Sequence, residues 1–291
     1  MEILKKSSEI INEASEFGIK LIEWDTMENR IGDEHLPPLL FLRNIIELTN
    51  SISILVNSGS IEPAKIILRS LIECVFSLEY MLENNSKNRA LSYLVWQIHK
   101  DIYFLDKLNL ESQMGKQFKN ELEKDKLLKQ NNNNEFFQSP GIKIQKRINE
   151  KLLSASHLKP IVEEYQKTCS KFKNPNWYSL FNGPKDINQL AKYIKLNASY
   201  ELLFRGYSNN VHSTDNLKNK LILDEDGRMS LSGIRSISNL NEVTQNSINF
   251  VLLAYINFCK NRIPNKYHLF LNWYNCFTKK RNEINPAISN S

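Results

Sequence analysis

Two sets of polar side chains are spaced so that each could form a reactive or binding cluster. Arg69 and Glu73 are four residues apart in IEPAKIILRSLIECVFSLEYML (61–82), and they are the only charged residues between positions 66 and 78. Residues four apart share one face of a helix, so the two side chains can meet. Apolar residues cover nearly every direction around the axis, which is typical of a buried helix. The sequence therefore predicts an ion pair in the core.

The Arg69–Glu73 pair leaves two interpretations open. A charge in the core is costly unless it is paired and hydrogen-bonded. The guanidinium of Arg69 carries five N–H donors, so it needs more partners than Glu73 supplies. Those partners could line a polar pocket, or they could form a closed structural network. If the pair were exposed, it would be an ordinary surface pair that contributes a few tenths of a kcal/mol.

The second cluster is at the end of a helical segment, in YELLFRGYSNNVHSTD (200–215). His212 follows Ser208 by four residues, and Asp215 follows His212 by three. Histidine changes its charge near neutral pH and is the commonest general base, so His212 is a candidate catalytic residue. The alternative is structural, because a histidine near a helix C-terminus interacts favourably with the helix dipole.

Arg205 and His212 also resemble the R-x(4–6)-H pattern of HEPN ribonucleases, with six residues between them. In those enzymes Arg and His from two helices, often across a dimer, act on an RNA phosphodiester without a metal ion. The pattern is not specific in this chain, because two further pairs fit its spacing: Arg30 with His35, and Arg262 with His268.

Helical periodicity and helix-breaking residues predict the elements that position these side chains. One helix runs over 38–58 and ends at Gly59, and the next runs over 60–83 with Ser60 as its N-cap. A turn this short predicts an antiparallel hairpin at the centre of the fold. We expect an all-α multi-helix bundle of about eight to ten helices. The remaining helical patterns cover about 3–24, 87–108, 111–130, 142–172, 186–212, 236–261 and 266–282, of which 111–130 is strongly charged and 142–172 is Lys-rich.

The domain prediction is a single helical domain over residues 1–291. Its core would span 35–215, completed by C-terminal helices over 236–282, with a mobile polar loop near 130–141. We expect the loop over 172–186 to be anchored by Trp177 and Phe181. Residues 213–235 lack a helical period and could form a short hairpin or an ordered loop.

Composition limits the function classes. Hydrophobic residues make up 41% of the 291 residues, so the chain is globular, and the net charge of +6 permits contact with RNA without requiring it. Four cysteines without C-x-x-C spacing and no recognisable signal peptide predict a cytoplasmic protein away from membranes. The five histidines are scattered, and no P-loop, G-x-G-x-x-G or H-E-x-x-H motif occurs, so we expect neither a metal nor a cofactor.

Two short motifs carry a resemblance to a known family. LRSLIE (68–73) and YSNNVHS (207–213) resemble the R-x-x-x-E and S-x-x-V-H motifs of a bacterial all-helical family of unknown function. The likeness covers about 35–215 and departs from the family pattern at two positions, Phe204 and Tyr207. It implies no known activity, although some related helical families occur in phage-defence and toxin–antitoxin loci. It also implies that four side chains converge in space: Arg69, Glu73, Ser208 and His212.

The leading functional hypothesis is a HEPN-like, metal-independent endoribonuclease that serves as a phage-defence or toxin effector. His212 would be the base, and either Arg205 or Arg69 would stabilise charge on the phosphate. Glu73 would orient the arginine, with Ser208 and Asp215 nearby. RNA is the expected partner, bound by Lys-rich surfaces at 115–129 and 142–151. The chain could also form a homodimer. The alternative is a non-catalytic helical binding or scaffold protein with a structural Arg–Glu–His network.

Overall fold

The computed structural model describes residues 2–128, 140–211, 221–223, 226–231, 233–235 and 237–289. Helices dominate this part of the chain, so the all-α prediction is confirmed. The chain forms two compact units, one of Met1–Ser86 with Asp186–Ser291 and one of Lys87–Lys185. The prediction of a single helical domain over 1–291 stays a prediction. Most of the polar loop expected near 130–141 lies outside the described residues.

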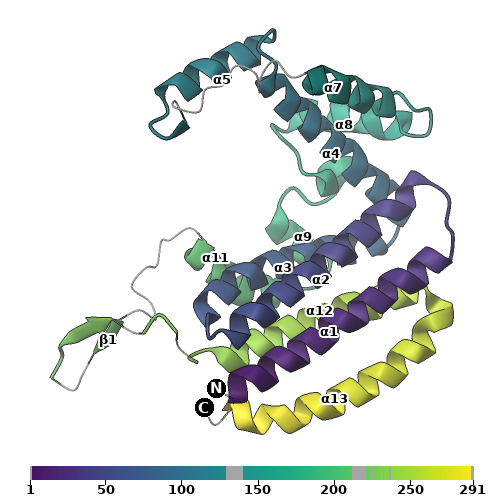
Figure 1. Ribbon diagram of the computed structural model, residues 1–291. Coiled ribbons are helices and arrows are strands. Elements are labelled where there is room, and N and C mark those ends of the chain that lie inside the picture. The colour runs from purple at the N-terminus through teal and green to yellow at the C-terminus, as the bar shows by residue number, and fades with distance from the viewer. Residues whose placement is uncertain are drawn as a thin grey trace. The chain divides into compact units, whose positions relative to one another are not determined.

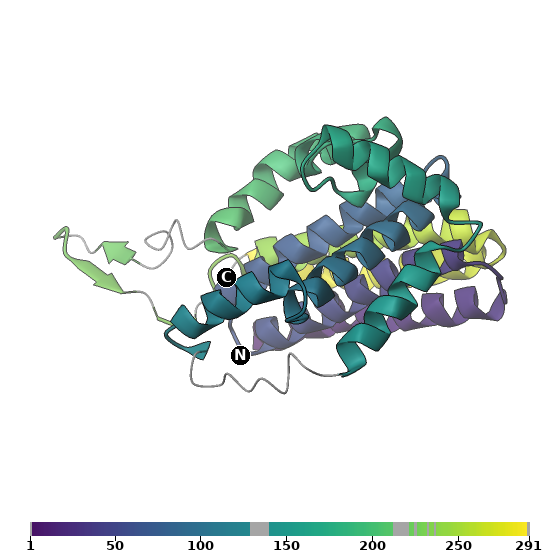
Figure 2. The same ribbon diagram turned by 90° about the horizontal axis from the view of Figure 1, so that it is seen from above.

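The first unit is built on a bundle of long helices (Figure 1). Helix α1 (Glu2–Met27) packs against α2 (Leu36–Asn57) and α12 (Leu240–Arg262), and α3 (Ile61–Leu82) packs against the same two helices. The C-terminal helix covers the first and the twelfth. Figure 2 shows helices α1, α2 and α3 running side by side. The helices are α1 (Glu2–Met27), α2 (Leu36–Asn57), α3 (Ile61–Leu82), α12 (Leu240–Arg262) and α13 (Tyr267–Ser289).

The predicted central hairpin is confirmed in α2 and α3. Gly59 lies between them with φ +71°, a left-handed conformation that glycine adopts without strain. The Ser60 N–H donates to Leu55 O at 2.8 Å, which closes the turn. Large side chains that the hairpin buries completely include Leu42, Ile45, Ile52, Leu68 and Phe76. The short turn and these apolar faces explain why α2 and α3 lie antiparallel.

One described stretch, Asp33–Asn57, is long and apolar enough to cross a membrane by length and composition alone. Its most apolar window has a mean hydropathy of 1.5. The core helix of a soluble protein meets the same criterion, and α2 within this stretch packs against both α1 and α3.

Helix α1 approaches its neighbours closely at Gly18. A Cβ atom there would overlap the hydroxyl of Tyr255 on α12 and the side chain of Ile46 on α2. The Tyr255 hydroxyl donates to Ala14 O at 3.0 Å, so this buried polar group is satisfied. Glycine at position 18 therefore allows α1 to pack against α2 and α12 at this distance.

The most deeply buried ion pairs in the described residues centre on Asp25, whose side chain is 1% exposed. Arg262 at the end of α12 donates Nε to Oδ1 at 2.9 Å and Nη2 to Oδ2 at 2.6 Å. Arg30 donates Nη1 to Oδ1 at 2.6 Å. A carboxylate that binds two guanidiniums fixes the C-terminal end of α1 to that of α12. The arginines of the two further R-x(4–6)-H matches, Arg30 and Arg262, thus have a structural role as partners of Asp25.

The helix expected over 186–212 is interrupted, so its prediction as one element was wrong. Asp186 caps α9 (Ile187–Tyr193) by accepting from the Gln189 N–H at 2.8 Å. Lys195 then has φ 61°, a left-handed conformation that ends the helix. Helical structure resumes in three joined segments and ends at the limit of the described residues: α10 (Asn197–Ser199), the π-helix η4 (Tyr200–Phe204) and α11 (Arg205–Val211).

The segment expected as a hairpin or an ordered loop contains two short strands. β1 (Leu221–Leu223) pairs antiparallel with β2 (Met229–Leu231), with Leu221 opposite Leu231. The hairpin alternative is therefore confirmed.

The second unit is smaller and has its own apolar cluster. Its buried members are Leu91, Val95, Leu158, Ile161 and Leu180. Trp177 is buried as predicted, whereas Phe181 is 43% exposed, so its prediction as an anchor was wrong. The backbone explains this, because Phe181 has φ 56° and donates its N–H to Glu164 Oε1 at 3.1 Å. The helices are α4 (Ser86–Leu108), α5 (Gln113–Lys124), α7 (Pro140–Leu153), α8 (Lys159–Lys171) and the 3-10 helix η3 (Trp177–Asn182).

Candidate functional site

The side chains of Arg69 and Ser208 meet between α3 and α11. Nε of Arg69 donates a hydrogen bond to Oγ of Ser208 at 2.9 Å. The Ser208 hydroxyl in turn donates to Phe204 O at 2.8 Å, one helical turn earlier. The hydroxyl proton is therefore engaged with the helix backbone, while the oxygen faces the guanidinium. Ser208 positions Arg69 and is not poised as a nucleophile.

The aromatic ring of Phe204 supports the Arg69 guanidinium from beneath. The Arg69 Cζ atom lies 4.3 Å from the ring centroid, a cation–π geometry. Phe204 is itself 4% exposed and stacks against Phe76 and Tyr200 with centroid distances of 6.4 and 5.4 Å. The guanidinium thus rests on a rigid aromatic surface, which fixes its position.

Glu73 lies at the edge of this site and not in the core. Its side chain is 50% exposed, against 21% for Arg69, and Nη1 of Arg69 is 3.5 Å from its Oε2. The prediction of a buried ion pair was therefore wrong for Glu73. Most of α3 is indeed enclosed, but Ile66 and Glu73 lie on an uncovered strip of the helix. Because Ile66 on this exposed strip is apolar, the sequence of α3 suggests a helix that is buried on all sides.

The π-helix η4 immediately precedes the serine of this site. A π-helix has wider turns than an α-helix, and such turns occur frequently at functional sites. In this chain the segment leaves Phe204 and Tyr207 buried and Ser208 half-buried against α3. The π-helix thus ends at Phe204, whose ring contacts Arg69, and leads directly into α11, which carries Ser208.

Tyr207 forms a polar network on the side of α11 that faces α12. Its hydroxyl donates to Glu242 Oε1 at 2.7 Å and accepts from Asn246 Nδ2 at 3.2 Å. Burial raises the pKa of the Tyr207 hydroxyl, and the hydrogen bond to Glu242 raises it further. The tyrosine therefore stays protonated at neutral pH. Sequence reasoning noted Tyr207 only as a departure from the family pattern and missed both partners.

A buried lysine lies on α3 one turn before Arg69. The Lys65 side chain is 6% exposed, and its Nζ is 2.8 Å from Glu62 Oε1. Asn239, which precedes α12, donates Nδ2 to the same oxygen at 3.3 Å. Charged and amide groups therefore hold the start of α12 against α3.

Of the other predicted site residues, Arg205 alone is described, and it does not join Arg69. Arg205 is 63% exposed in its side chain and pairs with Glu201 at 2.7 Å, so it points to solvent from α11. His212 and Asp215 lie outside the described residues. The structure therefore brings Arg69, Glu73 and Ser208 together, and it separates Arg205 from them.

The lysine-rich helices of the second unit are partly neutralised. Lys143 pairs with Glu111 at 2.7 Å, and Lys146 pairs with Asp106 at 2.6 Å. Paired lysines attract phosphate less strongly than free ones. Within the described ranges, no group of three or more His, Cys, Asp and Glu side chains could hold a metal ion.

A family comparison matches most of this region. The family of unknown function DUF5677 matches residues 35–229, which include Arg69, Glu73 and Ser208. The chain belongs to the DUF5677 family. The resemblance predicted from R-x-x-x-E and S-x-x-V-H is thereby confirmed, whereas nothing in the comparisons supports the likeness to HEPN ribonucleases. No curated protein and no solved structure matches this DUF5677 chain.

Proposed function

We propose that the chain is a metal-independent endoribonuclease whose reaction centre lies where α3 meets α11. The observation that supports this proposal is the 2.9 Å hydrogen bond from Arg69 to Ser208. It joins the R-x-x-x-E motif to the segment that leads, four residues later, to His212. Arg69 rather than Arg205 is the arginine of the proposed site, because Arg205 is turned outward and paired with Glu201.

Arg69 is prepared to meet an anion. Its Nε is occupied by Ser208 and its Nη1 lies beside Glu73, while no hydrogen bond to another described residue engages Nη2. About a fifth of its side chain remains exposed. A guanidinium held by Ser208, Glu73 and the Phe204 ring needs little reorganisation to bind a phosphate oxygen.

The proposed reaction uses one base and one fixed cation. His212 in its neutral form accepts the proton of the RNA 2′-hydroxyl, and the 2′-oxygen attacks the adjacent phosphorus. Negative charge on the phosphorane oxygens is stabilised by Arg69. The bond to the 5′-oxygen breaks, and that oxygen takes a proton from the imidazolium or from water. The products are a 2′,3′-cyclic phosphate and a 5′-hydroxyl, and the reaction needs no metal ion.

The competing function is a non-catalytic binding or scaffold protein. One observation favours it, namely that Ser208, Glu73 and Phe204 together already satisfy most of the Arg69 side chain. In that case the same contacts fix the register of α11 on α3. The two functions differ in whether His212 reacts.

The experiment that separates the two functions is an RNA-cleavage assay in EDTA. The purified full chain is incubated with mixed-sequence single-stranded RNA, alongside His212→Ala and Arg69→Ala. Arg43→Ala is the matched control, since Arg43 and Glu47 form a pair of the same spacing that is 69% and 59% exposed. The endoribonuclease proposal expects cleavage by the wild type and the control and none by the other two. A wild type that never cleaves, or cleavage that survives His212→Ala, contradicts it.

The proposed setting as a toxin or defence effector has its own test. Induced expression of the wild type would slow growth of the host cell, and expression of His212→Ala at the same level would not. Equal growth with both proteins contradicts the effector setting.

A further inference from the structure

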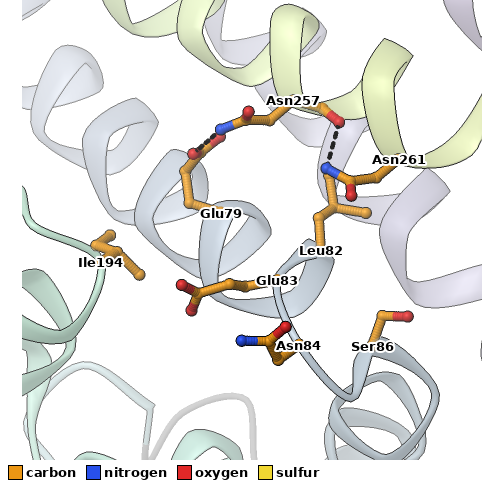
Figure 3. Close-up of a pocket in the computed structure, with 8 residues that line it drawn as sticks. All are labelled: Glu79, Leu82, Glu83, Asn84, Ser86, Ile194, Asn257 and Asn261. Atoms are coloured by element: carbon orange, nitrogen blue, oxygen red, sulfur yellow. Dashed lines mark hydrogen bonds between the residues drawn. The ribbon is translucent and has the colours of Figure 1, made fainter. Parts of the chain in front are cut away.

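A polar pocket of about 530 Å³ lies in the first unit, between the end of α3 and the last turns of α12. Figure 3 shows the carboxylate of Glu79 from α3, that of Glu83 directly after α3, and two carboxamides from α12, Asn257 and Asn261, around it. Asn257 and Asn261 are four residues apart, so they lie on one face of α12. Leu82 and Ile194 contribute apolar surface. Nothing in the proposed ribonuclease site uses these residues.

One N–H donor of each of the two carboxamides is already engaged within the protein. Nδ2 of Asn257 donates to Glu79 Oε2, and Nδ2 of Asn261 donates to Asn257 O at 2.9 Å (Figure 3). An asparagine side chain has an NH2 group with two N–H donors and one acceptor oxygen. The Oδ1 atoms of both residues accept no hydrogen bond from another described residue. Asn257 and Asn261 therefore offer a ligand their acceptor oxygens and one N–H each, and Asn84 and Ser86, which also line the pocket, add an amide and a hydroxyl.

The carboxylate of Glu79 adds a buried acceptor without a partner. Its Oε1 atom is shielded from solvent and forms no hydrogen bond with the described residues. Burial raises the pKa of Glu79 to about 7, and the nearby charge of Glu83 acts in the same direction. An ionised carboxylate held in this way lacks a counter-charge, and a cation bound in the pocket would supply one.

We propose that this pocket binds a small aliphatic amine, whose ammonium group forms an ion pair with the Glu79 carboxylate and donates to the Asn261 carboxamide oxygen. An ammonium carries a positive charge, three donors and no acceptor, which complements the two carboxylates and the Asn261 carboxamide oxygen of the pocket. The methylene chain packs on Leu82 and Ile194. A volume of about 530 Å³ lies within the range of small-molecule pockets and exceeds what a single ion fills.

Other ligand classes fit the pocket less well. An anion would meet two carboxylates without a facing cation among the residues that line the pocket. A divalent cation usually gathers six or more oxygen ligands, and the described residues contain no cluster of three His, Cys, Asp or Glu suited to a metal. An amine needs only two or three acceptors in place, which the pocket has.

The test is calorimetric titration of the full chain with spermidine and with agmatine, at about pH 8 and about 0.15 M salt, where Glu79 is ionised and weak surface binding is screened. We expect saturable binding by the wild type and a loss of at least about tenfold in affinity for Glu79→Gln. Glu47→Gln is the matched control, because this exposed carboxylate on α2 lies outside the pocket, and its affinity should equal that of the wild type.

Two further measurements keep the proposal falsifiable if Glu79→Gln folds poorly. Asn261 is exposed, so Asn261→Leu should fold normally and still weaken binding. At about pH 7 the amine should displace a proton from Glu79, so the binding enthalpy should differ between buffers of different ionisation enthalpy. No amine binding at millimolar concentration, unchanged affinity in both variants, or binding of Ca²⁺ or Mg²⁺ that amines do not displace would overturn it. Each of these results leaves the RNA-cleavage assay unaffected.

Discussion

Nε of Arg69 lies 2.9 Å from Oγ of Ser208, and this contact joins positions 139 residues apart in the chain. Neither residue is in a deep cavity, since the Arg69 side chain is 21% exposed. What defines the contact is the combination of one hydrogen bond, one aromatic ring and one carboxylate around a single guanidinium. Such an arrangement fixes a positive charge at the protein surface, which suits both a phosphate site and a structural contact.

Arg69→Ala should destabilise the chain moderately. The variant loses the hydrogen bond to Ser208 and the contact with the Phe204 ring, together about 1–3 kcal/mol. Because Glu73 is half exposed, its carboxylate is not left buried and unpaired, so the larger cost of a broken buried pair does not apply. Thermal melts of Arg69→Ala and Arg43→Ala test this. A loss for Arg43→Ala as large as that for Arg69→Ala would contradict it.

His212→Ala should separate stability from activity. If His212 is the base of the proposed reaction, the variant should lose RNA cleavage while its melting temperature changes little, because a histidine near a helix end contributes about 1 kcal/mol or less. Melting curves and cleavage in EDTA are measured on the same preparation. Loss of several degrees in melting temperature without any effect on RNA would instead assign His212 to a structural network.

Asp25→Asn should be the most damaging of the charge-removing substitutions considered. Asp25 is 2% exposed and faces two arginines, Arg30 and Arg262. Removing its charge leaves both guanidiniums without their counter-charge, at a cost of about 3–5 kcal/mol. The melting temperature should fall by roughly 6–20 °C. Glu47→Gln, which alters an exposed pair, is the control, and a similar change in both variants would contradict the expectation.

Much of the fold could be predicted from the sequence, because the signals were local. The hairpin of α2 and α3 followed from apolar periodicity, the Gly59 turn and Ser60. The interruption at Lys195 was missed, because a left-handed lysine has no distinctive sequence signature. The π-helix η4 was missed because its sequence, too, carries no distinctive signature.

The candidate site was predicted less well, because burial depends on neighbours that are distant in sequence. The charges of α3 looked like the core ion pair, yet the buried carboxylate with two arginines is Asp25, one residue beyond the predicted end of the first helix at 24. The convergence of Arg69 and Ser208 was predicted only through the family motifs. Nothing in the spacing of Glu79 indicated that it would meet Asn257.

Gly18→Ala should destabilise the bundle, although alanine is the better helix former. A methyl group at position 18 would overlap the Tyr255 hydroxyl and the Ile46 side chain, and overpacking of this kind costs about 1–3 kcal/mol. Gly206→Ala is the matched control, since nothing lies within 4 Å of a Cβ placed there in α11. It should gain up to about 1 kcal/mol from helix propensity. Chemical denaturation of both variants measures the difference, and equal shifts would contradict the close packing at Gly18.

Glu79 should make stability fall as the pH rises. Burial raises its pKa from the ordinary 4.5 to about 7 in the folded chain, so the folded state binds more protons than the unfolded state between these values. Where the folded state binds more protons, the free energy of unfolding decreases with rising pH. The contribution is therefore present below about pH 4.5, declines up to about pH 7 and is absent above it, and it amounts to about 3 kcal/mol at most.

Glu79→Gln cannot ionise, so it should remove this decline and leave the variant more stable than the wild type at about pH 8. Denaturant unfolding between about pH 5 and pH 8 measures both curves, with Glu47→Gln as the control. Parallel curves for wild type and Glu79→Gln would mean that the pKa of the Glu79 carboxylate is not raised. The proposal that an amine supplies a counter-charge to Glu79 would then lose this support.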